Sequence, residues 1–141
     1  MAVGDLGEKA FIESYPILAP VKSKDRAFDF DLKTGSTVEL KTDDYDMEAT
    51  KNFFMETSSH GKLGGAYRAK QDNVDYFVYY FIKNKTFFWF NTIKLCEKLD
   101  ELIASKKFKI KIIRNNGWTA EGYAIPRSEL ECVLMKKDVF P

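Results

Sequence analysis

The chain is poor in cysteine, histidine and proline, with two, one and four of them in 141 residues. Two cysteines, Cys96 and Cys132, are too few for a disulfide framework and lack the spacing of a zinc site, so we expect both to be reduced. No apolar run approaches the roughly 18 residues of a membrane span. The first residues also lack the basic and apolar segments of a secretory signal. These absences predict an intracellular protein with no membrane partner, in the cytoplasm, or in the host-cell cytoplasm if the source is a virus.

Several common catalytic motifs are missing as well. The single histidine, His60, lies in a glycine-containing loop, and no neighbouring pattern supports a Ser-His-Asp triad. Neither a phosphate-binding Gly-Lys-Ser/Thr loop nor a dinucleotide fingerprint is present. The strongest catalytic lead that remains is a pair of glutamate and lysine residues, described below.

Composition predicts one folded domain spanning residues 1–141. Hydrophobic residues make up 45% and charged residues 30% of the chain, which excludes disordered and low-complexity classes. Charge is distributed unevenly: residues 1–60 hold seven Lys and Arg against twelve Asp and Glu, whereas residues 61–141 hold fifteen against nine. An acidic half beside a basic half suits a metal site that faces a polyanion, and unrelated solvated faces explain it equally well.

Hydrophobic periodicity predicts an α/β fold. Apolar residues at helical spacing indicate helices over 5–14 and 92–105. Alternation and β-branched or aromatic enrichment indicate strands over 26–32, 37–42, 52–57, 75–82, 86–91 and 108–113. We therefore expect a mixed sheet of five or six strands flanked by two or three helices. The aromatic residues between 76 and 90 are more typical of a core or a subunit interface than of a base-stacking surface.

The first two long strands predict a hairpin whose register can be argued. Apolar residues must face apolar residues, which requires a loop with an odd number of residues. The loop Lys33-Thr34-Gly35 places glycine at its last position, where left-handed geometry is needed, and sets Asp29 opposite Glu39. A loop of residues 34–36 would set Asp31 opposite Glu39 instead, so Asp31 remains an alternative.

This hairpin carries the strongest chemical pattern, an acid followed ten residues later by Glu39-Leu40-Lys41. Two carboxylates on one sheet face, Asp29 and Glu39, can share Mg²⁺, which prefers oxygen ligands and keeps waters that a phosphate can replace. A lysine on that face, Lys41, can hold the attacking water and offset charge on the phosphate. Exposed cross-strand salt bridges produce the same pattern, so the motif alone is moderately specific.

At these residues the sequence resembles the PD-(D/E)XK nuclease superfamily, whose signature is an acid on a strand, a β-turn, and Glu-x-Lys on the next strand. The match comprises residues 28–30, Gly35 and residues 38–41, with Phe28 where the family often has proline. The resemblance implies a restriction-endonuclease-like core. It also implies that the main-chain carbonyl of Leu40 helps Asp29 and Glu39 to bind Mg²⁺, with Mn²⁺ able to substitute, and that Glu8 in the first helix contributes a further acid.

Within the superfamily, residues 50–78 resemble small phage-type and Holliday-junction-resolvase-like members. This resemblance places Glu56 near the metal and Lys70 or Gln71 near the scissile strand. A basic run beside glycines consists of Lys62, Arg68 and Lys70. Contact with phosphates and an ordinary solvated surface explain this run equally well.

The expected function is metal-dependent hydrolysis of phosphodiester bonds in DNA, including branched or recombination and replication intermediates, by a protein that could act as a homodimer. An RNA-cleaving nuclease uses the same core, so RNA is not excluded as a partner. A second hypothesis is a non-catalytic module that binds nucleic acid or protein on the same fold. A third, a virion or assembly protein, predicts neither metal nor nucleic-acid binding.

Overall fold

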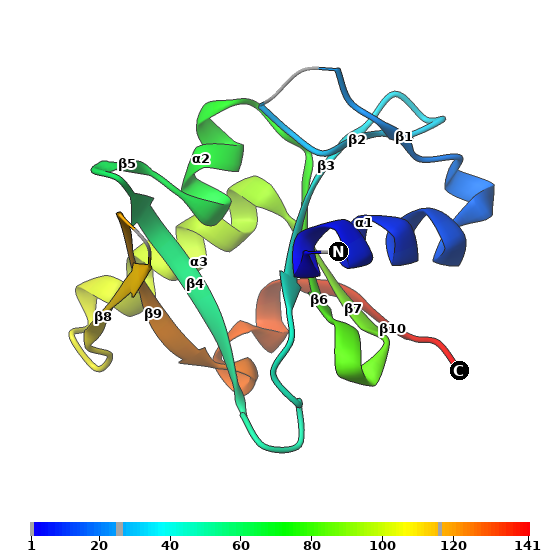
Figure 1. Cartoon of the computed structure of the whole chain (residues 1–141). Coiled ribbons are helices and arrows are strands. Elements are labelled where there is room, and N and C mark those ends of the chain that lie inside the picture. Colours follow the sequence, from blue (N-terminus) through cyan, green and yellow to red (C-terminus); the bar gives the residue numbers. More distant parts are fainter. Residues whose placement is uncertain (1, 25–26, 116) are drawn as a thin grey trace.

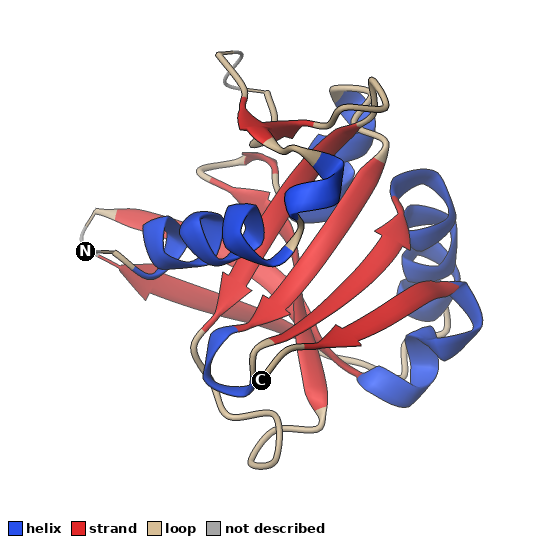
Figure 2. Cartoon of the chain, turned by 90° about the vertical axis from the view of Figure 1, so that its right-hand side faces the viewer, coloured by secondary structure: helices blue, strands red, loops and turns tan. Residues whose placement is uncertain are grey.

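The computed structural model describes residues 2–24, 27–115 and 117–141, and within them the chain forms three α-helices and ten strands (Figures 1 and 2). The helices are α1 (Val3–Ser14), α2 (Gly65–Gln71) and α3 (Thr92–Ala104). The strands are β1 (Val21–Lys22), β2 (Phe30–Asp31), β3 (Thr37–Asp43), β4 (Asn52–Ser59), β5 (Lys62–Leu63), β6 (Tyr76–Phe81), β7 (Thr86–Asn91), β8 (Ile110–Asn115), β9 (Trp118–Pro126) and β10 (Leu134–Val139). Short 3-10 helices occupy Pro16–Leu18, Ile82–Asn84 and Arg127–Val133.

The strands divide between two sheets. The larger sheet has six strands in the order β1-β2-β3-β6-β7-β10, and β3 and β6 are its parallel pair. The smaller sheet has the order β5-β4-β9-β8 and is antiparallel throughout. The expected mixed sheet with flanking helices is therefore present. The strands over 52–57 and 108–113, however, belong to a second sheet that periodicity did not predict.

Two apolar clusters hold the sheets and helices in three layers. Helix α1 packs on one face of the larger sheet through Phe11, among Val38, Val78 and Phe87. On the other face, Phe77, Tyr79, Phe81, Phe88 and Phe90 pack with residues of α2 and α3 and with Phe53 and Met55 of β4. Both faces of β6 and β7 are thus buried, which explains the unbroken aromatic sequence of these strands. Figure 1 shows α1 on one side of the larger sheet and the smaller sheet with α2 and α3 on the other.

A glycine sets the distance between α1 and β3. A methyl group at Gly7 would overlap the side chain of Thr42, so only glycine allows the helix to approach the strand this closely. This contact also sets how far the next helical residue, Glu8, lies from the larger sheet.

Several predicted boundaries differ from the observed ones. The strand predicted over 26–32 is reduced to Phe30–Asp31, and Arg26 lies outside the described residues. Helix α2 and strands β9 and β10 were not predicted. In the described part of the chain, no helix is long and apolar enough to cross a membrane.

Candidate active site

The hairpin between β2 and β3 has the register predicted from the three-residue loop. Phe30 pairs with Val38, and Asp31 pairs with Thr37. Gly35 adopts a φ of 90°, the left-handed conformation that the last loop position requires, and its N–H donates to Leu32 O at 2.9 Å. The regular pairing ends at Phe30. Asp29 lies just before β2, and its N–H donates to Val38 O at 3.1 Å, so the predicted pair of Asp29 and Glu39 is not part of the strand pairing. The alternative acid, Asp31, is exposed and lies opposite Thr37 instead.

Asp29 lies where β2 begins and binds the main chain of the neighbouring strand. The N–H of Leu40 donates to Asp29 Oδ2 at 2.7 Å. The side chain of Asp29 thus accepts the Leu40 N–H, which would otherwise donate to a main-chain carbonyl if β2 were longer. Because the N–H and C=O of one strand residue point to the same edge, the Leu40 carbonyl also points toward the edge where Asp29 lies.

The carboxyl groups of Asp29 and Glu39 meet on the face of the larger sheet that carries the smaller sheet and α2. Burial, a hydrogen bond with Asp29 and the negative charge of Asp29 together raise the pKa of Glu39 from its usual 4.5 to about 9. From α2, Arg68 lowers that pKa and Asp72 raises it, each to a smaller extent. Two acids are therefore held together at a separation where both cannot ionise easily without a cation.

Lys41 follows Glu39 on the same face of β3, because alternate strand residues share a face. Its positive charge acts on Glu56 of β4, whose pKa is raised by burial and partly lowered again by this lysine. Glu56 is half-buried beside the start of α2, where a methyl group at Gly64 would lie 2.5 Å from Glu56 Oε1. The positive charge of Lys41 is thus felt by an acid of the smaller sheet.

Glu8 approaches the acid pair only through a lysine. Lys22 Nζ of β1 lies 2.8 Å from Glu8 Oε2. Glu8 raises the pKa of Lys22 most, by hydrogen bond and charge, and the charges of Asp5 and Asp29 also raise it. Lys22 therefore lies between Glu8 and Asp29, and the two carboxylates are not shown in direct contact.

The donor set suits a hard divalent cation. Two carboxyl groups and a main-chain carbonyl supply oxygen atoms only, which is the chemistry that Mg²⁺ and Mn²⁺ prefer, with water completing the shell. Burial and the neighbouring Asp29 raise the pKa of Glu39 and so favour neutralisation of its charge. Within residues 2–24, 27–115 and 117–141, no three acidic, histidine or cysteine side chains are grouped as a metal cluster. Of the expected acids, only Asp29 and Glu39 are therefore shown together.

The predicted nucleic-acid contacts are spread over β5 and α2. Arg68 acts on Glu39 and forms an ion pair with Asp72 at 3.6 Å, so it adjoins the acid pair. Lys62 is exposed on β5, while Lys70 and Gln71 are exposed on α2. The charge of Lys70 acts on Cys96 of α3, so this lysine lies on the side of α2 that faces another helix.

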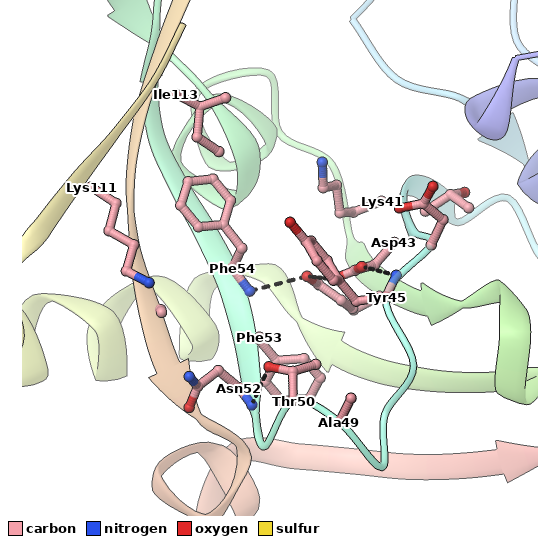
Figure 3. Close-up of a pocket in the computed structure, with 14 residues that line it drawn as sticks. Lys41, Asp43, Tyr45, Ala49, Thr50, Asn52, Phe53, Phe54, Lys111 and Ile113 are labelled. Atoms are coloured by element: carbon pink, nitrogen blue, oxygen red, sulfur yellow. Dashed lines mark hydrogen bonds between the residues drawn. The ribbon is translucent and has the colours of Figure 1, made fainter.

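Next to Lys41, the structure contains a cleft that sequence reasoning missed. It has a volume of about 680 Å³ and lies between β3 with the loop that follows it and the strands β4, β9 and β8 (Figure 3). At its base, the hydroxyl of Tyr79 donates to Asp43 Oδ2 and accepts the N–H of Phe54 at 3.0 Å. The alternation Glu39, Lys41, Asp43 could have indicated a third polar residue on this face of β3.

Comparisons with known proteins assign no family to the chain. No family model matches it, and neither a curated protein nor a solved structure shows significant similarity to it. The resemblance to PD-(D/E)XK nucleases therefore rests on the sequence pattern described above.

Proposed function

We propose that this protein is a metal-dependent nuclease with a PD-(D/E)XK core that hydrolyses phosphodiester bonds of DNA. The observation that carries the proposal is the contact between the carboxyl groups of Asp29, just before β2, and Glu39 of β3, with Lys41 two residues along the same face of β3. A solvated salt-bridge pattern would leave the two acids at ordinary pKa values in water. Here burial and mutual repulsion raise the pKa of Glu39 to about 9, which is typical of a functional site.

Each residue has a specific role in this proposal. Asp29, Glu39 and the carbonyl of Leu40 would hold Mg²⁺ or Mn²⁺. When bound, the cation would acidify a water molecule and stabilise negative charge on the phosphate. Lys41 would hold the attacking water by donating a hydrogen bond and would offset the charge that develops on the phosphate oxygens. Glu56 would keep the Lys41 ammonium oriented toward that water.

The resemblance to small phage-type and resolvase-like nucleases suggests a branched or recombination and replication intermediate as the DNA substrate, and a homodimer as the active form. The acid pair and Lys41 recognise phosphate and do not distinguish sugars. Cleavage of RNA is therefore an alternative, and the experiment below tests it by comparing RNA with DNA as substrate.

The decisive experiment compares linear, circular and four-way-junction DNA with RNA, each incubated with Mg²⁺, Mn²⁺ or EDTA. We expect cleavage with either metal and none with EDTA. Asp29→Asn, Glu39→Gln and Lys41→Gln should each reduce the rate by at least about 100-fold, the size of effect typical of a lost catalytic group. The matched control is Asp31→Asn, which alters the exposed acid two residues from Asp29 and should cleave normally. Cleavage that survives the three site variants would contradict the proposal.

A non-catalytic nucleic-acid-binding module on the same fold is the second candidate. It is favoured by one observation, that the described residues group two acids and not three at the site. This candidate predicts metal-independent binding of nucleic acid with no cleavage of any substrate.

A further inference from the structure

The cleft beside Lys41 has the dimensions of a ligand site. Its volume of about 680 Å³ falls within the range of roughly 300–1,000 Å³ that is usual for such sites. One wall comes from residues 41–45 and the loop at 49–50, and the other from β4, β9 and β8. Lys41 belongs both to the cleft wall and to the proposed active site, so a ligand in the cleft would adjoin the acid pair.

The hollow in the second wall comes from small residues on the middle strand. Ala124 of β9 pairs with Phe54 of β4, and Gly122 pairs with Glu56 on one side and with Lys111 of β8 on the other. A methyl group at Gly122 would lie 2.7 Å from Phe54 Cζ, so the aromatic ring leans over the glycine. Larger residues on β9 would fill the space between Phe54 and Lys111.

Aromatic side chains line the cleft on both walls. The side chain of Tyr45 is 70% exposed, and Phe54 is half-buried. The loop that carries Tyr45 is held in place, because the N–H of Tyr45 donates to Asp43 Oδ1 at 2.8 Å. An exposed ring on an anchored loop is suited to stack on a flat partner, and nucleic-acid bases are such partners.

Cationic and polar groups complete the lining. Lys41 lies on β3, and Lys111 lies on β8 at the opposite wall, on the same side of β4 as the amide of Asn52 (Figure 3). In the described structure the side-chain amide of Asn52 has no hydrogen-bond partner, while its main-chain N–H donates to Thr50 Oγ1 at 3.3 Å. Of the acids in the lining, Asp43 is already bonded to Tyr79 and Tyr45, and Asp44 is exposed.

We propose that this cleft binds an unpaired nucleotide of the substrate, with its base stacked against Tyr45 and a flanking phosphate bound by Lys111. The inference rests on the proposed nuclease function and names its substrate class, which is nucleic acid with a single-stranded segment at the cleavage site. In a duplex the faces of the bases are stacked on one another, so only a base that has left the stack can contact these rings.

Binding measured without catalysis tests the inference. Fluorescence anisotropy in EDTA would compare a labelled oligothymidylate of about 20 nucleotides with RNA of the same length and with a duplex. We expect the single strand to bind at least about tenfold more tightly than the duplex. Tyr45→Ser, at an exposed position, should weaken single-strand binding at least about fivefold. Lys111→Gln should reduce the slope of log affinity against log salt concentration by about 0.7.

The control variant is Lys94→Gln, which removes an exposed lysine of α3 that does not line the cleft and should change neither value. Equal affinity for single strand and duplex, or unchanged binding by Tyr45→Ser, would overturn the inference even if the protein cleaves DNA. Single-strand binding that depends on Tyr45, without cleavage in Mg²⁺, would instead refute the nuclease function and keep the cleft as a nucleotide-binding site. Equal affinity for single-stranded DNA and single-stranded RNA would support the inference, because stacking on an aromatic ring does not depend on the sugar.

Discussion

Asp29 and Glu39 share a hydrogen bond between their carboxyl groups across β2 and β3, and this contact ties the stability of the fold to the chemistry of the site. A proton on Glu39 supplies the hydrogen for that bond. Removing the proton leaves two half-buried carboxylates in contact, a costly arrangement in a partly desolvated site. A divalent cation would take the place of the proton.

We expect the metal-free protein to lose stability as pH rises. The pKa of Glu39 is about 9 in the folded state and near 4.5 when the chain unfolds, so the folded state binds the extra proton between these values. The free energy of unfolding should therefore fall between pH 4.5 and 9, with a slope of at most about 1.4 kcal/mol per pH unit from this group. Urea unfolding in EDTA would measure it. Glu39→Gln should flatten the dependence, and an equally steep curve in that variant would refute the assignment.

Metal binding should release a proton. At neutral pH Glu39 is mainly protonated, and a cation would bind its ionised form. Calorimetric titration with Mn²⁺ in two buffers of different ionisation enthalpy should give a release approaching one proton per ion. Asp29→Asn should abolish the binding heat, whereas Asp31→Asn should retain it. Binding of Mn²⁺ that is independent of pH would contradict this expectation.

The close contact of α1 with β3 predicts opposite effects for two glycines in one helix. Gly7→Ala places a methyl group against Thr42 and should destabilise the fold by about 1–3 kcal/mol, because the helix must move away from the strand. Gly4→Ala meets no atom within 4 Å and should raise stability by up to about 1 kcal/mol, since alanine favours helix. Urea unfolding of both variants would test the contact, and destabilisation by both would argue against it.

The buried hydroxyl of Tyr79 should matter more than that of its neighbour Tyr76. Tyr79→Phe leaves the buried carboxylate of Asp43 and the N–H of Phe54 without this partner, at a cost of about 1–3 kcal/mol. Tyr76→Phe, on the same strand, removes a hydroxyl with no such bonds and should cost less than about 0.5 kcal/mol. Chemical denaturation of the two variants provides the comparison, and equal stabilities would show that the Tyr79 bonds are weak.

Local patterns predicted the hairpin of the site well. The apolar alternation of Phe30 and Val38, together with Gly35 at the last loop position, was sufficient to select the register that pairs Phe30 with Val38, and the carboxyl groups of Asp29 and Glu39 meet just beyond that pair. Alternation also predicted β3 closely, because strand faces depend on neighbours two residues apart, and aromatic enrichment predicted β7.

Local sequence patterns could not predict that the strands divide between two sheets. Phe53 of β4 pairs with Ile125 of β9, 72 positions away, and no local signal specifies such a partner. Helix α2 spans only Gly65–Gln71 and begins at two glycines, which favour turns, so its pattern is too short to detect. The cleft depends on the second sheet, which supplies Phe54 and Lys111 to its lining, and that is why the cleft emerged only from the structure.

The hydrogen bond from Leu40 to Asp29 Oδ2 occupies one of the two oxygens of that carboxylate. An ion at this site would therefore meet Asp29 chiefly through its other oxygen, and water would have to fill much of the coordination sphere. Such a hydrated environment with few protein ligands suits Mg²⁺, which gives up its waters reluctantly. It suits Ca²⁺ less well, because Ca²⁺ commonly takes six to eight ligands and often binds both oxygens of a carboxylate. If the proposed metal site forms here, a single main-chain contact would thus bias it toward the smaller alkaline-earth ion.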